Sequence, residues 1–214
     1  MPALLEDRPR VVPRTFDVVA IATSLGGLHA LSQVLSALPA SFPAPIIVVQ
    51  HLSSLYPSHL DELLAAHTRL SVKWAQHGEL VRPGRVYLAP RDHHLAVSGR
   101  HTLRLSQSPQ VNYSRPAADP LFLSIAACYH QRALGVILTG GGSDGALGAQ
   151  AIKRNGGRVL AQDQATAEKF DMPEAAILTG CVDFILPLSS IAPALVSLVM
   201  VPGAAGLLRV HAAS

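Results

Sequence analysis

The pattern of hydrophobic and polar residues predicts a chain in which strands alternate with helices. Short runs rich in valine, isoleucine and leucine recur along the sequence, and several contain almost no polar residue. Such runs are typical of strands that are buried on both faces of a parallel sheet. The predicted strands span residues 16–22, 46–50, 71–74, 85–89, 134–138, 158–161 and 182–186.

Helix signals lie between these strands, and one segment departs from the pattern. Prolines in Asp119-Pro120 and Met172-Pro173 mark helix starts, and the Asn-Gly-Gly at 155–157 marks a helix end. In HHLAVSGRHTLRLS, residues 93–106, two alternating runs flank a Ser-Gly-Arg turn and predict an antiparallel hairpin. Leucines spaced as on one helix face follow the first strand at Leu28, Leu31, Leu35 and Leu38.

The sequence therefore predicts one α/β domain with a doubly wound, mostly parallel sheet flanked by helices and a small antiparallel β-hairpin. A chain of 214 residues is long enough to bury the core of one such domain. We expect a flexible N-terminal lead at 1–15, the domain at 16–200 and a C-terminal tail at 201–214. The uncharged run 191–208 is a candidate membrane span, but its prolines and glycines favour a closing helix at about 191–200.

Composition and charge exclude several classes of protein. Charged residues make up 14% of the chain and hydrophobic residues 49%, which is typical of a compact folded protein and not of a disordered one. The net charge is only +3 and the arginines are scattered, so we expect no nucleic-acid partner. Cys128 and Cys181 form no CxxC pair, and the N-terminus has no signal-peptide core. We therefore expect reduced cysteines in the core, a cytoplasmic location and no insertion into a membrane.

Polar residues follow three of the predicted strands directly. Ser24 follows the first strand, His51 the second, and the segment TGGGSDG at 139–145, which contains Asp144, the fifth. The carboxyl ends of parallel strands meet at one edge of a sheet, so we expect these residues to lie together. A serine, a histidine and an aspartate are the groups that nucleophilic acyl transfer requires. The glycines allow backbone N–H groups to converge on an oxyanion or a phosphate.

Each of these residues also has a simpler interpretation. A serine or an aspartate that precedes a helix often caps it, which applies to both Ser24 and Asp144. His51 is one of ten histidines, so by itself it indicates little. The pair His93-His94 is a weak metal candidate, because neighbouring strand residues point to opposite faces and no third ligand is close in sequence.

The common glycine and serine motifs do not decide between these interpretations. GxGxxG and GxxxxGK[ST] are absent, and GxSxG fails because Ala22 stands where the first glycine belongs. The order serine, histidine, aspartate also differs from that of α/β-hydrolases, in which the acid precedes the histidine. A catalytic triad and a phosphate cradle at GGGSDG both stay open at this point.

Several segments in order resemble the catalytic domain of the CheB-type protein-glutamate methylesterases of bacterial chemotaxis. The similarity spans about residues 17–199. IATSLGGLHAL is similar to the family's IGASTGG and its helix, VVQH at 48–51 is present unchanged, and LTGGGSDGALG at 138–148 matches LTGMGxDGAxG. Four further segments resemble the family: YLAPRDHHL, VNYSRPAADPLF, AQDQATAEKFDMPEAAI and GCVDFILPLSSIA.

The resemblance implies a serine hydrolase. Ser24 would be the nucleophile, His51 the general base and Asp144 the residue that orients the histidine. The substrate would be a methyl ester on a glutamyl side chain, with methanol as product, and deamidation of glutamine is a second implied activity. No cofactor and no metal are implied. The candidate oxyanion donors are the backbone N–H groups of Leu25, Gly140, Gly141 and Gly142.

The implied partners are the methylated helical bundle of a chemoreceptor and a separate receiver or chemosensory protein. Two other functions stay open from the sequence. One is a catalytically weak interaction module of a chemosensory array, and the other is a nucleotide-binding Rossmann-like protein. Hydrolysis of a generic ester that depends on Ser24 argues against the first, and thermal stabilisation by a nucleotide favours the second.

The sequence departs from the family pattern in several ways, which include larger residues at Ala22 and Thr23. Leu25 replaces a threonine after the nucleophile, so the help of that hydroxyl is lost. Gly141 replaces a methionine, which keeps the backbone N–H and makes the loop more mobile. Only about fifteen residues precede the first predicted strand, so we expect a stand-alone esterase that lacks a receiver domain and on-chain control by phosphorylation.

Overall fold

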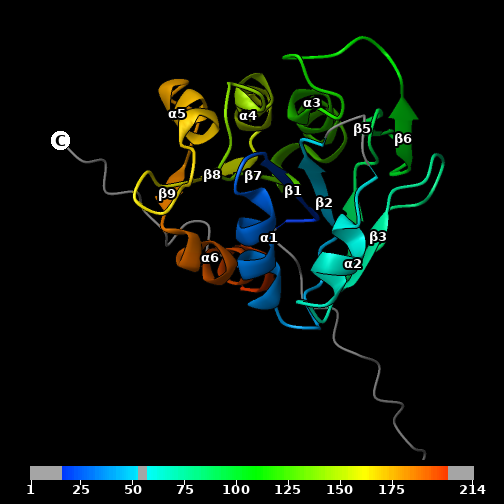
Figure 1. Ribbon diagram of the computed structural model, residues 1–214, viewed down its shortest axis with the longest axis horizontal. Helices are drawn as coiled ribbons and strands as arrows, with labels where there is room; N and C mark the ends of the chain where they lie inside the picture. The colour runs from blue at the N-terminus through cyan, green and yellow to red at the C-terminus, as the bar shows by residue number, and fades with distance from the viewer. Residues whose placement is uncertain (1–15, 53–56, 202–214) are drawn as a thin grey trace, which may run out of the picture.

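A computed structural model describes residues 16–52 and 57–201, which form a seven-stranded sheet with helices on both faces (Figure 1). All neighbouring strands of this sheet pair in parallel, in the order β3-β4-β2-β1-β7-β8-β9. The strands are β1 (Val18–Thr23), β2 (Ile46–Gln50), β3 (Ser71–Trp74), β4 (Arg85–Leu88), β7 (Ala133–Ile137), β8 (Arg158–Gln162) and β9 (Phe184–Leu186).

The helices form two layers (Figure 1). Helices α1 and α6 cover one face of the sheet, with α2 beside α1, and α3, α4 and α5 cover the other. A separate antiparallel pair, β5 (His94–Val97) and β6 (Leu103–Ser106), packs against α3. The helices are α1 (Gly27–Ser36), α2 (Leu60–Ala65), α3 (Ala118–Tyr129), α4 (Ala146–Arg154), α5 (Asp171–Leu178) and α6 (Leu188–Met200), with the 3-10 turn η1 (His130–Arg132) after α3.

Alternate residues of the central strand belong to the two different layers of the core. In β1, Val19 and Ile21 pack with the residues of α1 and α6, whereas Val18, Ala20 and Ala22 pack with those of α3 and α4. Both faces of the strand are buried, which is the physical reason for an uninterrupted apolar run. The predicted α/β doubly wound fold is therefore confirmed.

The predicted strand positions at 46–50 and 71–74 and the hairpin agree with the structure, and other bounds shift by one or two residues. The first and the last strand each begin two residues later than predicted, at Val18 and at Phe184. The carboxylate of Asp183 accepts hydrogen bonds from Val159 N–H, Lys153 and Arg158. A side chain therefore takes the backbone donor of β8 at this position, and the pairing of β8 with β9 begins at Phe184. The last helix begins at Leu188, three residues before the predicted start.

Two expectations about side chains are corrected, and two about the ends of the chain lie mainly outside the described residues. Leu28 is 42% exposed, although its spacing predicted an inward position. Cys128 and Cys181 are free but only half-buried. The predicted lead at 1–15 and all of the tail except Val201 fall outside the described ranges. Within those ranges, no helix has both the length and the apolar character needed to cross a bilayer.

The strand order brings three loops to one point. After β1 the chain adds β2, β3 and β4 on one side of β1, and it later adds β7, β8 and β9 on the other side. The direction of winding therefore reverses between β1 and β7, which is a topological switch point. The strand ends are level, because Thr23 pairs with Gln50 and Ala22 pairs with Ile137. The residues that follow β1, β2 and β7 therefore meet at the carboxyl edge of the sheet.

Candidate active site

Ser24 is the first residue after β1, and its backbone is held from both neighbouring strands. Its N–H donates to the carbonyl of Thr139, 3.0 Å away, and its own carbonyl accepts from Gln50 Nε2 at 2.8 Å. The N-cap of α1 is Gly26, with φ of 78°, and no side chain caps that helix. The interpretation of Ser24 as a helix cap is therefore wrong, and its side chain is left for another role.

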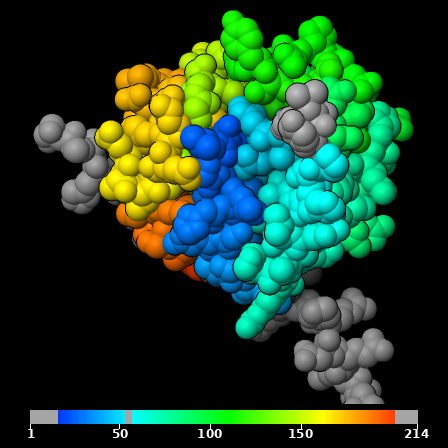
Figure 2. All heavy atoms as spheres, in the orientation of Figure 1, coloured from blue at the N-terminus to red at the C-terminus, as the bar shows by residue number. Residues whose placement is uncertain are grey.

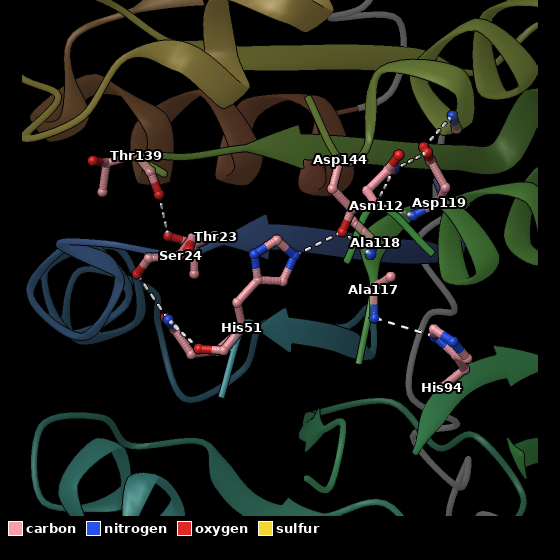
Figure 3. Close-up of polar contacts among 12 residues, drawn as sticks. Thr23, Ser24, His51, His94, Asn112, Ala117, Ala118, Asp119, Thr139 and Asp144 are labelled. Carbon is pink, nitrogen blue, oxygen red and sulfur yellow. Dashed lines mark hydrogen bonds and ion pairs between the residues drawn. The ribbon is translucent and has the colours of Figure 1, made fainter. Parts of the chain in front are cut away.

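His51 and Asp144 form a direct pair. His51 Nε2 lies 2.7 Å from Asp144 Oδ2, although the two residues are 93 positions apart in the sequence. The imidazole lies between Ser24 and Asp144, with its second nitrogen turned to the serine side (Figure 3). Nε2 is bonded to Asp144, so Nδ1 is the nitrogen that can accept a proton from Ser24. No hydrogen bond joins Ser24 to His51 among the described residues, which is common before substrate binds.

Asp144 is buried but accepts several hydrogen bonds (Figure 3). Besides His51, its carboxylate accepts the backbone N–H of Ala118 at 2.5 Å, that of Asp119 at 3.1 Å and the Asn112 amide at 3.1 Å. The two backbone donors belong to the first turn of α3, where unpaired N–H groups and the helix dipole favour an anion. Asp144 therefore caps α3 and not the following helix α4, whose N-cap is Gly145.

The charge of Asp144 is set by two opposing effects. Burial disfavours the ionised carboxylate and would raise its pKa, but the hydrogen bonds from His51, Ala118 N and Asp119 N outweigh burial, so the pKa of Asp144 is lowered. The neighbouring carboxyl of Asp119 behaves in the opposite way. Burial raises the pKa of Asp119, and the nearby charge of Asp144 raises it further. The hydrogen bonds consequently favour the ionised form of Asp144 beside the histidine.

The glycine loop after β7 packs directly on Ser24. Its position is fixed because Gly140 N–H donates to Lys169 O at 2.8 Å, while Met172 N–H donates to the Gly140 carbonyl at 2.9 Å. Because its N–H is bonded to Lys169, Gly140 is not available as an oxyanion donor. The role of Gly140 is close packing against Ser24. The backbone N–H groups of Leu25, Gly141 and Gly142 donate to no acceptor within the described residues.

Sequence reasoning missed a set of threonine and glutamine contacts behind Ser24. Thr23 Oγ1 donates to Thr139 O at 2.8 Å, and Thr139 Oγ1 donates to Leu25 O at 3.0 Å. Gln162 Oε1 accepts Thr139 N–H at 2.8 Å. Thr23, Thr139 and Gln162 are all buried, and a polar residue that ends an apolar strand was the signal that could have found them.

A cleft of about 700 Å³ opens beside Ser24 and His51. On the face seen in Figure 2, the blue segment lies between yellow and cyan segments. The cleft lining includes Ser58, Leu60, Leu63 and Glu168. Its walls include Leu25, Leu28 and Leu63, whose side chains are partly exposed. An apolar cleft that ends at a serine and a histidine suits a protein side chain brought to Ser24.

Comparison with known proteins shows the family to which this fold belongs. A sequence model of the family described as CheB methylesterase matches residues 19–195. The chain belongs to the CheB methylesterase family. This finding confirms the family that the motifs predicted.

Relatives with named activities support the assignment. The chain is 49% identical over 179 residues to protein-glutamate methylesterase/protein-glutamine glutaminase 2 of Anaeromyxobacter dehalogenans, covering 84% of this chain and 52% of the relative. It is 43% identical to protein-glutamate methylesterase FrzG of Myxococcus xanthus, covering 86% of this chain and 55% of the relative. The chain thus spans about half the length of these curated relatives.

A solved CheB structure has the same fold. The crystal structure of the Thermotoga maritima CheB methylesterase catalytic domain superimposes with a TM-score of 0.83 at 39% identity. The match covers 86% of this chain and 98% of that domain. The mostly parallel sheet, the flanking helices and the small hairpin are therefore features of the CheB catalytic domain.

The predicted metal candidate has a structural role in this CheB domain. His94 is buried, with Nε2 3.1 Å from the carbonyl of Pro109 and Nδ1 accepting the N–H of Ala117 at 3.3 Å. His93 Nδ1 lies 3.0 Å from the carbonyl of Arg91. His93 precedes β5 and His94 is its first residue, and each ring contacts a different backbone carbonyl.

Proposed function

We propose that this chain is a serine hydrolase that removes methyl esters from glutamyl side chains of chemoreceptors and releases methanol. The observation that carries the proposal is the 2.7 Å contact between His51 Nε2 and Asp144 Oδ2, with the imidazole lying between Asp144 and Ser24 (Figure 3). Membership of the CheB methylesterase family and the names of the relatives support it.

In the first step, Ser24 Oγ attacks the γ-carbonyl carbon of the ester while His51 Nδ1 takes its proton. The resulting imidazolium is stabilised by the ionised Asp144, which also holds the ring in one orientation and tautomer. The oxyanion of the tetrahedral intermediate is bound by backbone N–H groups, for which Leu25, Gly141 and Gly142 are the candidates.

In the second step, the C–O bond to the methoxy group breaks and the imidazolium returns its proton, so methanol leaves. Water then attacks the acyl-enzyme with His51 as base, and glutamate and free Ser24 are restored. Glutamine deamidation follows the same steps with ammonia as product. An amide has the poorer leaving group and depends more on His51 as an acid, so we expect deamidation to be the slower reaction. Neither route calls for a cofactor.

The substrate partner follows from the cleft. A helix of a methylated receptor would bring its side chain to Ser24 across the leucines of the cleft wall. A separate receiver or chemosensory protein is a second proposed partner. The two free cysteines support a cytoplasmic location, where thiols stay reduced.

Methanol release from methylated receptor membranes, with and without the purified chain, tests this function. Ser24→Ala should abolish release, and hydrolysis of p-nitrophenyl acetate should fall in parallel. Ser143→Ala is the matched control, because Ser143 is an exposed serine on the neighbouring loop and should leave both rates unchanged. Hydrolysis that survives Ser24→Ala in a folded protein would exclude Ser24 as the nucleophile.

A further inference from the structure

A short segment between β6 and α3 reaches the triad carboxylate from outside the sheet. We call residues 107–117 the strap. Asn112 and Tyr113 form its tip, with φ of 50° and 60°, and Val111 and Ser114 exchange backbone hydrogen bonds of 3.1 and 2.9 Å across them. This is a two-residue turn with both central residues in the left-handed region, which asparagine tolerates better than most residues.

The base of the strap is held by charged and buried groups. Arg115 donates to Asp92 Oδ1 at 2.9 and 2.6 Å and to the carbonyls of Gln107 and Ser108 at 2.9 Å. His94 contacts the strap at two further backbone positions, as described above. The strap is therefore fixed to the β5–β6 hairpin at both ends, and the position of Asn112 is determined by more than its own turn.

The Asn112 amide donates its two hydrogens to two different carboxylates (Figure 3). Nδ2 lies 2.9 Å from Asp119 Oδ2 and 3.1 Å from Asp144 Oδ1. The other oxygen of Asp119 accepts Gly148 N–H at 2.8 Å, so the Asp119 carboxylate is itself held by α4. An amide has one end that donates and one that accepts, so only one orientation of Asn112 can serve both carboxylates.

This arrangement addresses a specific electrostatic problem. Two carboxylates share a buried site. Burial raises the pKa of Asp119, and the charge of Asp144 raises it further. A donor between them attracts both and offsets part of their repulsion. Asn112 and His51 are the two side chains that donate to Asp144 within the described residues, and they do so at different oxygens.

We propose that Asn112 is a positioning residue for the His51–Asp144 pair, and that Asp119 holds the Asn112 amide in place. The inference rests on the proposed esterase activity and deepens it. Asn112 acts by fixing the rotation of the Asp144 carboxylate, so that Oδ2 points at Nε2 of His51. A small loss of this alignment misdirects the base, and the loss is felt in the chemical step and not in substrate binding.

The test compares Asn112→Gly, Asn112→Asp and Tyr113→Asn on p-nitrophenyl acetate. Asn112 is exposed and glycine accepts its φ, so these variants should fold. Asn112→Gly should lower kcat by about 10- to 100-fold, as for a hydrogen bond to a charged group, with KM within about twofold. Tyr113→Asn should leave both constants unchanged, because Tyr113 is 97% exposed and keeps a residue suited to the turn.

Asn112→Asp adds a readout that a purely structural role would not move. This substitution replaces the amide donor by a third carboxylate, which faces Asp119 and Asp144. The other titratable or charged groups nearby are His51, bonded to Asp144, and the Arg115–Asp92 pair at the base of the strap. A proton added to this cluster restores a donor, so kcat/KM relative to wild type should rise about fivefold or more from pH 8 to pH 6.5. The same ratio for Asn112→Gly should stay constant with pH.

A second measurement separates this inference from the proposed function. The downfield proton NMR signal of His51 Nε2–H reports the bond to Asp144 without any substrate. It should shift or broaden in Asn112→Gly and stay in place in Tyr113→Asn. An inactive wild-type chain would refute the esterase, and the NMR signal would still decide the role of Asn112. A wild-type NMR signal together with a wild-type kcat in Asn112→Gly, or a pH-independent ratio in Asn112→Asp, would overturn the inference.

Discussion

Gly140 packs against Ser24 so closely that a Cβ atom on the glycine would lie 2.8 Å from the Ser24 Cβ and 3.0 Å from its backbone nitrogen. The same atom would also overlap the sulfur of Met172. The glycine loop after β7 and the serine turn after β1 are therefore one packed unit. The position of Ser24 depends on a residue 116 positions away.

A methyl group at Gly140 should consequently displace Ser24. We expect Gly140→Ala to lower kcat for p-nitrophenyl acetate by about 10²-fold, because a displacement near 1 Å is enough for such a loss. Gly99→Ala is the control, since no atom lies within 4 Å of its Cβ position. Equal kcat values for the two variants, with folding checked by circular dichroism, would contradict the packing argument.

Ser24 and His51, the proposed nucleophile and base, should act as one unit. Ser24→Ala and His51→Ala should each lower kcat by about 10⁴- to 10⁶-fold, since both residues act in the same step. The double variant should cost little more than either single change. Steady-state kinetics on the three variants provide the comparison. Losses that multiply in the double variant would mean that the two residues work independently.

The charge of Asp144 should set the acid limb of the pH profile. Asp144→Asn removes the negative charge that stabilises the imidazolium, so the rise of kcat/KM with pH should begin at a lower pH than in wild type. The plateau should fall by about 10²- to 10⁴-fold. Asp17→Asn is the control, because Asp17 pairs with Arg132 before the start of β1, at the opposite end of the sheet. An unchanged acid limb in Asp144→Asn would show that its charge does not act on the base.

The raised pKa of Asp119 makes a prediction about stability. The folded state binds this proton more tightly than the unfolded state, so Asp119 contributes stability that falls as pH rises above the ordinary aspartate pKa of about 3.9. The free energy of unfolding of wild type relative to Asp119→Asn should therefore decrease as pH is raised from about 4. Asp144, whose pKa is lowered, is present in both proteins, so its contribution to the difference in unfolding free energy largely cancels. Urea unfolding from pH 4 to pH 7 measures the difference, and a difference that increases with pH would contradict the sign.

The leucines of the cleft should matter for a protein substrate and not for a small ester. Leu63 is 48% exposed in the cleft wall, so Leu63→Ser should leave the fold and the hydrolysis of p-nitrophenyl acetate intact. Methanol release from methylated receptor membranes should fall, because apolar contact with the receptor helix is lost. Leu178→Ser is the control, since Leu178 is 79% exposed on α5 and lies outside the cleft lining. Equal effects of the two changes would argue against docking at this cleft.

The positions of the strands and of the three triad candidates could be predicted from local pattern. A strand covered by helices on both faces must be apolar throughout, so β1 and β2 stand out in the sequence. Parallel strands end at the same edge, so the polar residues Ser24, His51 and Asp144 at three strand ends were expected to meet. These predictions need only the periodicity of the chain and the geometry of a parallel sheet.

Contacts between distant side chains could not be predicted in the same way. Asn112 looked like part of a family segment, yet its amide joins Asp119 and Asp144. Leu28 fits a buried helix face by spacing, yet it is partly exposed and lines the cleft.

The sequence by itself determined the order of elements, the apolar strands and the polar residues at their ends, because these depend on neighbours a few positions away. Only the tertiary structure decided which N–H groups stay unpaired, how the pKa of each carboxyl group shifts and which amide lies between the two. Gly140 N–H is taken by Lys169, and the pKa of Asp144 is lowered because α3 and His51 donate to it. Each outcome depends on hydrogen bonds a few ångströms long between residues tens of positions apart, and no local pattern encodes those distances.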